Sequence, residues 1–234
     1  NEKFSKIEVD FFSEERLQSA RLEFVNGRRE AYLNDVKKPA PSHLMGKITS
    51  IVFSPEHLSL VKGGPSVRRK FIDSAICQVK PKYSAYLVRY NKILNQRNAL
   101  LKDISYYSEL ADTLEIWDKE LALTGSVIIS ERLKYISELS AVAGEYHRGI
   151  SESKEALQLA YTGKYSGSED TSCIYDEFCN TLDKSRNEDI SLKYTTKGPH
   201  RHDVDIIINN RSAKMYASQG QQRSAVLSLK LAEA

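Results

Sequence analysis

Apolar and polar residues alternate along the opening third of the chain. Residues 3–12 and residues 20–25 both follow this two-residue period, which is typical of strands. Asn26-Gly27 separates the second run from a third one over residues 28–33, and this dipeptide is the strongest short signal for a hairpin turn. The pattern therefore predicts an antiparallel β-meander.

The middle of the chain has a helical pattern instead, with apolar residues that recur every seven positions. Two such stripes are typical of an antiparallel helix pair, and at ~1.5 Å per residue the first helix would be roughly 30 Å long. The first stripe comprises Tyr83, Tyr86, Leu87, Tyr90, Ile93, Leu94, Leu100 and Leu101, and the second comprises Tyr107, Leu114, Leu121, Ile128, Tyr135 and Val142.

Short runs on both sides of the helical region predict further elements. Residues 49–53 have the pattern of a short buried strand, and residues 156–161 alternate like a strand. A helix is expected over residues 174–182. Residues 204–208 predict a strand that is followed by the turn Asn209-Asn210 and by a second strand through Tyr216.

The segment before the last predicted helix has unusual chemistry. Ser218 followed three residues later by Gln221 is a capping-box pattern that marks a helix start. The run over residues 225–232 is apolar almost all round and predicts a buried helix. Gly220, without a Cβ, would let a phosphate or another backbone approach, and a helix start attracts anions. A purely structural Ser-capped helix start is the open alternative.

Length and composition fit one substantial core, or one domain with an appended lobe, in a 234-residue chain. With 41% hydrophobic and 28% charged residues the chain has the composition of a soluble globular protein. No apolar run approaches the ~18 residues of a membrane span, and no secretory signal is recognisable. The odd, widely spaced Cys77, Cys173 and Cys179 argue against a disulfide framework or a zinc site. The absence of an initiator Met and an end inside a helix suggest a piece of a longer protein.

The positive charge lies mainly in the first third of the chain. Residues 1–80 carry 14 Lys and Arg against 10 Asp and Glu, whereas the whole chain has a net charge of +3. Clustered cations at a helix start can bind DNA backbone phosphates without sequence preference. The best candidates are Arg68, Arg69 and Lys70, and the second are Arg28 and Arg29. Equally open is that the Arg68-Arg69 pair anchors one part of the protein against carboxylates of another.

The octet of residues 217–224 resembles the signature motif of ATP-binding-cassette (ABC) ATPases, in the variant that the RecF family carries. RecF proteins act in bacterial DNA replication and repair and have a head related to SMC-type ATPases. The blocks that support the resemblance are Phe53-Ser54-Pro55-Glu56, Arg68-Arg69-Lys70-Phe71, Gln96-Arg97-Asn98, Trp117-Asp118 and Gly198-Pro199-His200-Arg201. Ser54-Pro55 stands in place of the Q-loop glutamine, and His202 stands where the family usually has an acid.

The resemblance, which covers residues 52–234, implies a mixed α+β (α/β) fold. It is an incomplete ABC-type ATPase head with a β-meander and an inserted helical lobe, an antiparallel helix pair of coiled-coil type. Residues 1–80 would be the first part of the head (lobe I), residues 81–155 the helical arm (lobe II), and residues 156–234 the return to the head with the signature.

The resemblance also implies a function. The full-length parent would bind ATP and Mg²⁺, dimerise on ATP and bind single-stranded and double-stranded DNA at gaps and junctions. Its roles would be recombinational gap repair and the SOS response, with RecR and RecO as partners, in the bacterial cytoplasm on the nucleoid and away from membranes.

The implied nucleotide site acts in trans, because the signature of one head would face the ATP that the other head holds. Its residues would be Ser218, Gln219, Gly220, Gln221, Gln222 and Arg223, with His200 a candidate for the nucleotide face. Residues 62–65 lack the GxxxxGK[ST] spacing of a phosphate loop, and the run 204–208 ends in Asn209 rather than in paired acids. The chain alone is therefore not expected to hydrolyse ATP or to hold a nucleotide.

Two other functions remain open from the residues. The chain could be a coiled-coil adaptor that binds protein through its helical pair and has no nucleotide function. It could also be a metal hydrolase, because His200 and His202 near Asp203 and Asp205 are possible ligands of a divalent ion, although no further ligand has a recognisable spacing.

Overall fold

A computed structural model describes residues 4–13, 15–47, 49–163, 165 and 169–233. The chain forms two units, of which the first comprises Asn1–Ser50 and Cys77–Ser84 and the second Ile51–Ile76 and Ala85–Ala234.

The first unit contains the predicted β-meander. Its strands are β1 (Phe4–Ser13), β2 (Arg16–Val25), β3 (Arg28–Leu33) and β4 (Val36–Lys38), all antiparallel in the order β1-β2-β3-β4, and a short helix η1 (Pro41–Leu44) follows. Asn26 and Gly27 have φ angles of 49° and 79°, as the two-residue hairpin turn between β2 and β3 requires. The hairpin prediction is confirmed.

The buried strand predicted over residues 49–53 is wrong. These residues form no regular element, and Val52 and Phe53 are 61% and 55% exposed. A strand needs a neighbour with which to exchange backbone hydrogen bonds, and none of the described strands pairs with this segment. Ser54 does start a helical segment, as predicted, because its side chain accepts from the backbone N–H of Glu56 at the start of η2 (Pro55–Leu58).

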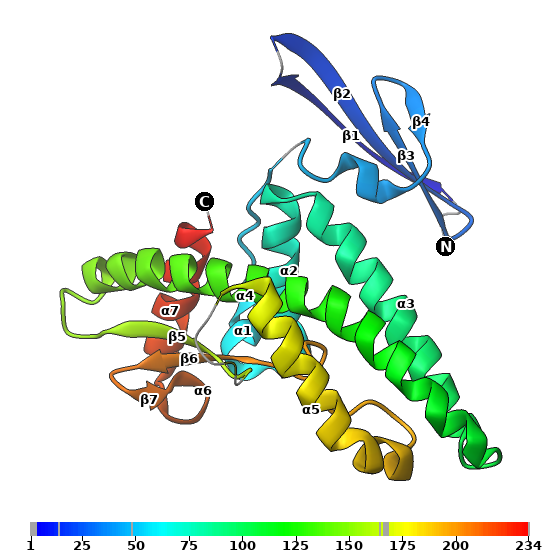
Figure 1. Ribbon diagram of the computed structural model, residues 1–234. Helices are drawn as coiled ribbons and strands as arrows, with labels where there is room; N and C mark the ends of the chain where they lie inside the picture. Colours follow the sequence, from blue (N-terminus) through cyan, green and yellow to red (C-terminus); the bar gives the residue numbers. More distant parts are fainter. Residues whose placement is uncertain (1–3, 14, 48, 164, 166–168, 234) are drawn as a thin grey trace. The chain divides into compact units, whose positions relative to one another are not determined.

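The second unit is built around a long helix, α4. Its helical elements before the second sheet are η2, α1 (Ser59–Lys62), α2 (Pro65–Val79), α3 (Lys82–Asp103), η3 (Ser108–Thr113), α4 (Leu114–Ile150) and α5 (Thr171–Leu192). Figure 1 shows α3, α4 and α5 side by side. The predicted antiparallel helix pair is α3 and α4, joined through η3.

The second apolar stripe, whose members recur every seven residues, is buried only in the first half of α4. Leu114, Leu121 and Ile128 are at most 1% exposed, but Tyr107 precedes the helix and Val142 is 41% exposed. A straight helix drifts by ~20° per heptad from a strict seven-residue repeat, so the stripe leaves the packed face. The predicted helix over residues 174–182 is longer, from Thr171 to Leu192, and packs on α4.

A second sheet and the last helix lie against the C-terminal half of α4 (Figure 1). The sheet has the antiparallel order β5 (Leu157–Tyr161), β6 (Val204–Ile208), β7 (Arg211–Ser212), and the helices α6 (Ala213–Tyr216) and α7 (Gln219–Ala232) follow it. The predicted second strand through Tyr216 is therefore mostly wrong, because Ala213 is buried at the start of a helical turn.

The prediction of a buried α7 that is apolar almost all round needs correction as well. Ala225, Val226 and Leu229 are buried, but so are Ser228 and Lys230, whereas Leu227 is 36% exposed. Among the described residues, the helices are too short or too polar for any of them to cross a bilayer.

Candidate functional site

The start of α7 is an open, capped tip. The Ser218 Oγ accepts from the Gln221 backbone N–H at 3.2 Å, and the Gln221 Oε1 accepts from the Ser218 N–H at 2.8 Å, so the predicted capping box is present. Ser218, Gln219 and Gly220 are exposed. A Cβ built on Gly220 would find no atom closer than the Ser218 Oγ at 3.8 Å. A second molecule can therefore approach the backbone of the tip.

A chain of hydrogen bonds connects the tip to α4. The Gln221 Nε2 donates to the Glu155 Oε1 at 2.8 Å, and the Glu155 Oε2 lies 3.0 Å from the Nε2 of His147. The other ring nitrogen of His147 lies 3.2 Å from the Ser228 Oγ. His147 is fully buried, so the orientation of Gln221 depends on the end of α4. Sequence reasoning missed Glu155 and His147, because nothing in the sequence shows that they lie near the octet.

The remaining residues of the octet differ in exposure. Gln222 is 7% exposed and its Nε2 donates to the Ala217 carbonyl at 2.9 Å. It therefore shapes the loop rather than facing a partner. Arg223 is exposed and borders a pocket of about 480 Å³ whose other lining residues are Phe53, Ser54, Pro55, Leu58, Val226 and Leu227.

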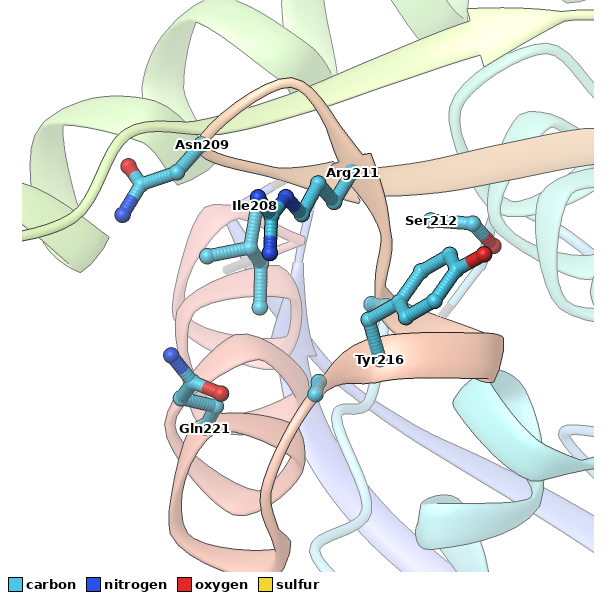
Figure 2. A pocket seen from close by; sticks show the side chains of 8 residues that line it. Ile208, Asn209, Arg211, Ser212, Tyr216 and Gln221 are labelled. Carbon is cyan, nitrogen blue, oxygen red and sulfur yellow. The ribbon is translucent and has the colours of Figure 1, made fainter.

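A pocket of about 340 Å³ lies directly beside the tip (Figure 2). Figure 2 shows Arg211 from the start of β7, Tyr216 from α6 and Gln221 from α7 around it. The full lining is Ile208, Asn209, Arg211, Ser212, Ala213, Tyr216, Ala217 and Gln221. A guanidinium and several hydroxyl or amide groups thus stand beside the open N–H groups of the helix start, a combination suited to an anion.

Arg68 lies inside the protein and not on a cationic surface. It is 6% exposed, and its Nε and Nη2 each donate to one carboxylate oxygen of Asp203 at 2.7 Å. Its Nη1 donates to the carbonyls of Leu60 and Gly63. Burial raises the pKa of Asp203, but the hydrogen bonds from Arg68 and Val204 outweigh this and leave that pKa below its ordinary value. The geometry favours the anchoring alternative for this arginine.

The other basic candidates are more accessible. Arg69 is half-buried and donates to the His202 carbonyl at 2.8 Å. Lys70, Arg28 and Arg29 are exposed, and the Arg29 Cζ lies 5.7 Å from the ring centre of Phe24. As DNA contacts these four residues stay predictions.

Arg68→Ala is expected to lower the free energy of unfolding by about 2–3 kcal/mol, because it leaves the partly buried Asp203 carboxylate without its cation. Lys70→Ala, on the exposed side of the same helix, is the matched control and should change it by less than about 0.5 kcal/mol. Urea unfolding of both variants measures this. Equal stability of the two variants would contradict an anchoring role.

The two histidines of the metal alternative are hydrogen-bonded separately. The His200 Nδ1 lies 2.7 Å from the Tyr90 hydroxyl and its Nε2 lies 3.1 Å from the Thr195 carbonyl. The His202 Nδ1 lies 2.7 Å from the Tyr161 hydroxyl. Within the described ranges, no group of three or more His, Cys, Asp or Glu is arranged to hold a metal ion. His200 faces Tyr90 of the helical lobe, and its proposed place at a nucleotide stays a prediction.

No model of a known protein family matches the chain, but curated relatives match most of it. The DNA replication and repair protein RecF of Ruminiclostridium cellulolyticum is 43% identical over 212 residues, which are 90% of this chain and 57% of the relative. Those of Lachnoclostridium phytofermentans and Acetivibrio thermocellus are 45% and 38% identical. The matches cover 82% and 96% of this chain, and 51% and 62% of these relatives.

Two solved structures have the same fold. They are structures of the recombination mediator protein RecF in the RecFOR pathway, one with ATP and one with ATPrS. Their TM-scores are 0.93 and 0.89, and each is 32% identical to this chain, covering 100% of it and 63% of its own chain.

The mixed α+β fold, with its helical lobe and its capped glycine-bearing tip, places the chain in the fold class of the two solved RecF structures. Within this class, the chain belongs to the RecF family of DNA replication and repair proteins. It spans 51–62% of the length of these curated relatives, so the activity and partners of a whole protein are a matter of proposal.

Proposed function

We propose that this protein acts in DNA replication and repair by pairing two ATP-bound heads, and that the α7 tip contacts the γ-phosphate of the ATP held by the second copy. The observation that carries the proposal is the open face of Gly220 above a fully formed capping box. The capping box stabilises α7 within one chain, but the open space over Gly220 can be used only by a second molecule, because the tip is exposed.

The residues at the tip fit a polyphosphate. Free N–H groups and the dipole of a helix start attract anions by ~0.3–1 kcal/mol when exposed and up to ~2 kcal/mol when partly buried. Ser218 and Gln219 border the space through which a phosphate would reach Gly220, and Arg211 adds a cation beside that space. ATP supplies the negative charge that brings two such tips toward each other's nucleotide. Mg²⁺ would accompany ATP, without a ligand assigned among these residues.

The relatives support the wider role. Both similar solved structures are of the recombination mediator protein RecF in the RecFOR pathway, and one of them is of RecF with ATP. We extend this to gap repair and the SOS response, with DNA at gaps and junctions and with RecO and RecR as partners. Such a role would place the protein on the nucleoid in the bacterial cytoplasm.

Ser218→Arg in the full-length protein is expected to weaken ATP-dependent dimerisation at least tenfold. The long side chain replaces the cap and fills the space over Gly220 that the phosphate needs. Analytical ultracentrifugation with and without ATP measures the dimer, and equilibrium binding of a fluorescent ATP analogue measures nucleotide binding within each head, which should persist.

Ser137→Arg is the matched control, because Ser137 is exposed on α4 and gains the same charge without touching the tip. It should dimerise like the unaltered protein. ATP-dependent dimerisation that is undiminished in Ser218→Arg would contradict the proposal and favour the adaptor alternative.

A further inference from the structure

A row of exposed aromatic rings lies at the distal end of the helical lobe. Tyr106 and Tyr107, in the connection after α3, are 79% and 59% exposed, and Tyr194, just after α5, is 40% exposed. The two segments meet because Ile190 of α5 packs on the cluster of Leu101, Ile104 and Leu114. Figure 1 shows the end of α3 and the end of α5 at the same end of the lobe.

Cations alternate with these rings. The Lys193 Nζ lies 5.9 Å from the ring centre of Tyr106, and the Arg201 Cζ lies 4.9 Å from that of Tyr194. Tyr106, Lys193, Tyr194 and Arg201 therefore form a continuous row, which we call the aromatic–cationic row. Among the described residues, neither Lys193 nor Arg201 is in a salt bridge, whereas the nearby Lys197 pairs with Glu188 at 3.4 Å.

A backbone turn at Lys193 keeps the centre of the aromatic–cationic row exposed to solvent. Lys193 ends α5 in the left-handed region, with a φ of 61°, a conformation in which a non-glycine residue is uncommon. The turn that it makes leaves both Lys193 and Tyr194 exposed, while Thr195, the next residue, is 1% exposed. The hydrogen bond from the Thr195 N–H to the Asn98 Oδ1 at 2.8 Å fixes the end of this turn on α3.

Flat rings that alternate with unpaired cations fit one class of ligand. Unpaired bases stack on aromatic side chains, and Lys and Arg contact the phosphates between them. A duplex hides its base faces, so it would use the cations and not the rings. An acidic peptide would likewise depend on Lys193 and Arg201 and only weakly on the rings.

We propose that the aromatic–cationic row binds single-stranded nucleic acid, with bases stacked on Tyr106 and Tyr194 and phosphates held by Lys193 and Arg201. The proposal rests on the DNA-binding function proposed above. It assigns the single-stranded contact to the end of the helical lobe, far along the sequence from the arginine cluster of α2.

The experiment measures fluorescence anisotropy of a labelled poly(dT) oligonucleotide and of a labelled hairpin duplex with the full-length protein and ATP. Tyr194→Ala combined with Tyr106→Ala is expected to weaken poly(dT) binding about tenfold or more, with duplex binding changed less than twofold. Tyr194→Phe should keep most of the affinity, because stacking needs the ring and not the hydroxyl. Arg201→Gln should lower the slope of log affinity against log salt by ~0.7 on poly(dT).

Tyr146→Ala is the matched control, since Tyr146 is 45% exposed but lies near the other end of α4. Poly(dT) binding by the double tyrosine variant equal to that of this control would overturn the inference while leaving DNA binding by the protein intact. Equal losses on poly(dT) and duplex would also overturn it. If the unaltered protein bound neither poly(dT) nor the hairpin duplex, both the proposed DNA-binding function and this inference would fail.

Discussion

Arg97→Met is expected to lower the free energy of unfolding by about 3–5 kcal/mol, the cost of leaving buried carboxylates without their cation. The side chain of Arg97 is 0% exposed. Its Nε donates to Asp118 on α4, and its Nη1 donates to Asp189 on α5 and to Thr195, at 2.7, 2.7 and 2.8 Å. One guanidinium thus joins α3, α4, α5 and the loop beyond.

The two carboxylates would respond differently to the loss of Arg97. Asp118 keeps the hydrogen bond from Arg186 at 2.9 Å. Asp189, whose side chain is also 0% exposed, keeps only neutral donors from Thr196. Most of the destabilisation therefore comes from Asp189, and Asp189→Asn should restore part of the stability of Arg97→Met. Urea unfolding followed by circular dichroism measures the single and double variants.

Arg89→Met is the matched control, because Arg89 on α3 pairs with Glu120 on α4 at 2.7 Å. The two side chains of this pair are 57% and 44% exposed. An exposed pair contributes only about 0–1 kcal/mol. If Arg97→Met and Arg89→Met had the same unfolding midpoint, the buried cluster would not be what holds the three helices together.

The sequence patterns that were confirmed are those that depend on near neighbours. The β2–β3 turn follows from Asn26-Gly27, and the α7 tip follows from Ser218 and Gln221, because the interacting groups are three residues apart or fewer. The antiparallel pairing of α3 and α4 also followed from periodicity. The residues that specify each of these elements lie within the element itself.

The patterns that failed depend on partners far along the chain. Residues 49–53 are apolar enough for a strand but have no described strand beside them. Arg68 has the sequence context of a phosphate-binding cation, yet Asp203, 135 residues away, binds it. Glu155 is equally invisible, because it lies 66 residues from Gln221. Charge and periodicity do not encode which distant groups meet.

The family-like blocks Gln96-Arg97-Asn98 and Trp117-Asp118 gain a physical reason from the fold. Arg97 binds Asp118, and Asn98 accepts from the backbone of Thr195. The loop that continues from Thr195 carries Gly198-Pro199-His200-Arg201. The helical lobe is thereby connected to the turn that holds His200, which the sequence placed only by resemblance.

Lowering the pH from about 7 to about 4 is expected to destabilise the second unit by several kcal/mol through His200 and His202. Burial lowers the pKa of His200 to about 4, and burial together with the charge of Arg132 lowers the pKa of His202 to about 3. Unfolded histidine titrates near 6.5. Between these values the unfolded chain binds protons that the folded chain does not, so stability falls as the pH falls through this window. Each ring contributes on the order of 3 kcal/mol by the acid end.

Urea unfolding at a series of pH values measures this dependence, and the His202→Asn variant isolates one ring. The slope of its unfolding free energy against pH should be smaller, by up to the contribution of one bound proton between about pH 6 and 4, because Asn does not titrate. His43→Gln is the matched control, since it replaces a histidine that is exposed. The Tyr161 hydroxyl lies 2.7 Å from the His202 Nδ1. A ring that titrates near 6.5 in the folded protein by NMR would contradict the lowered pKa of His202.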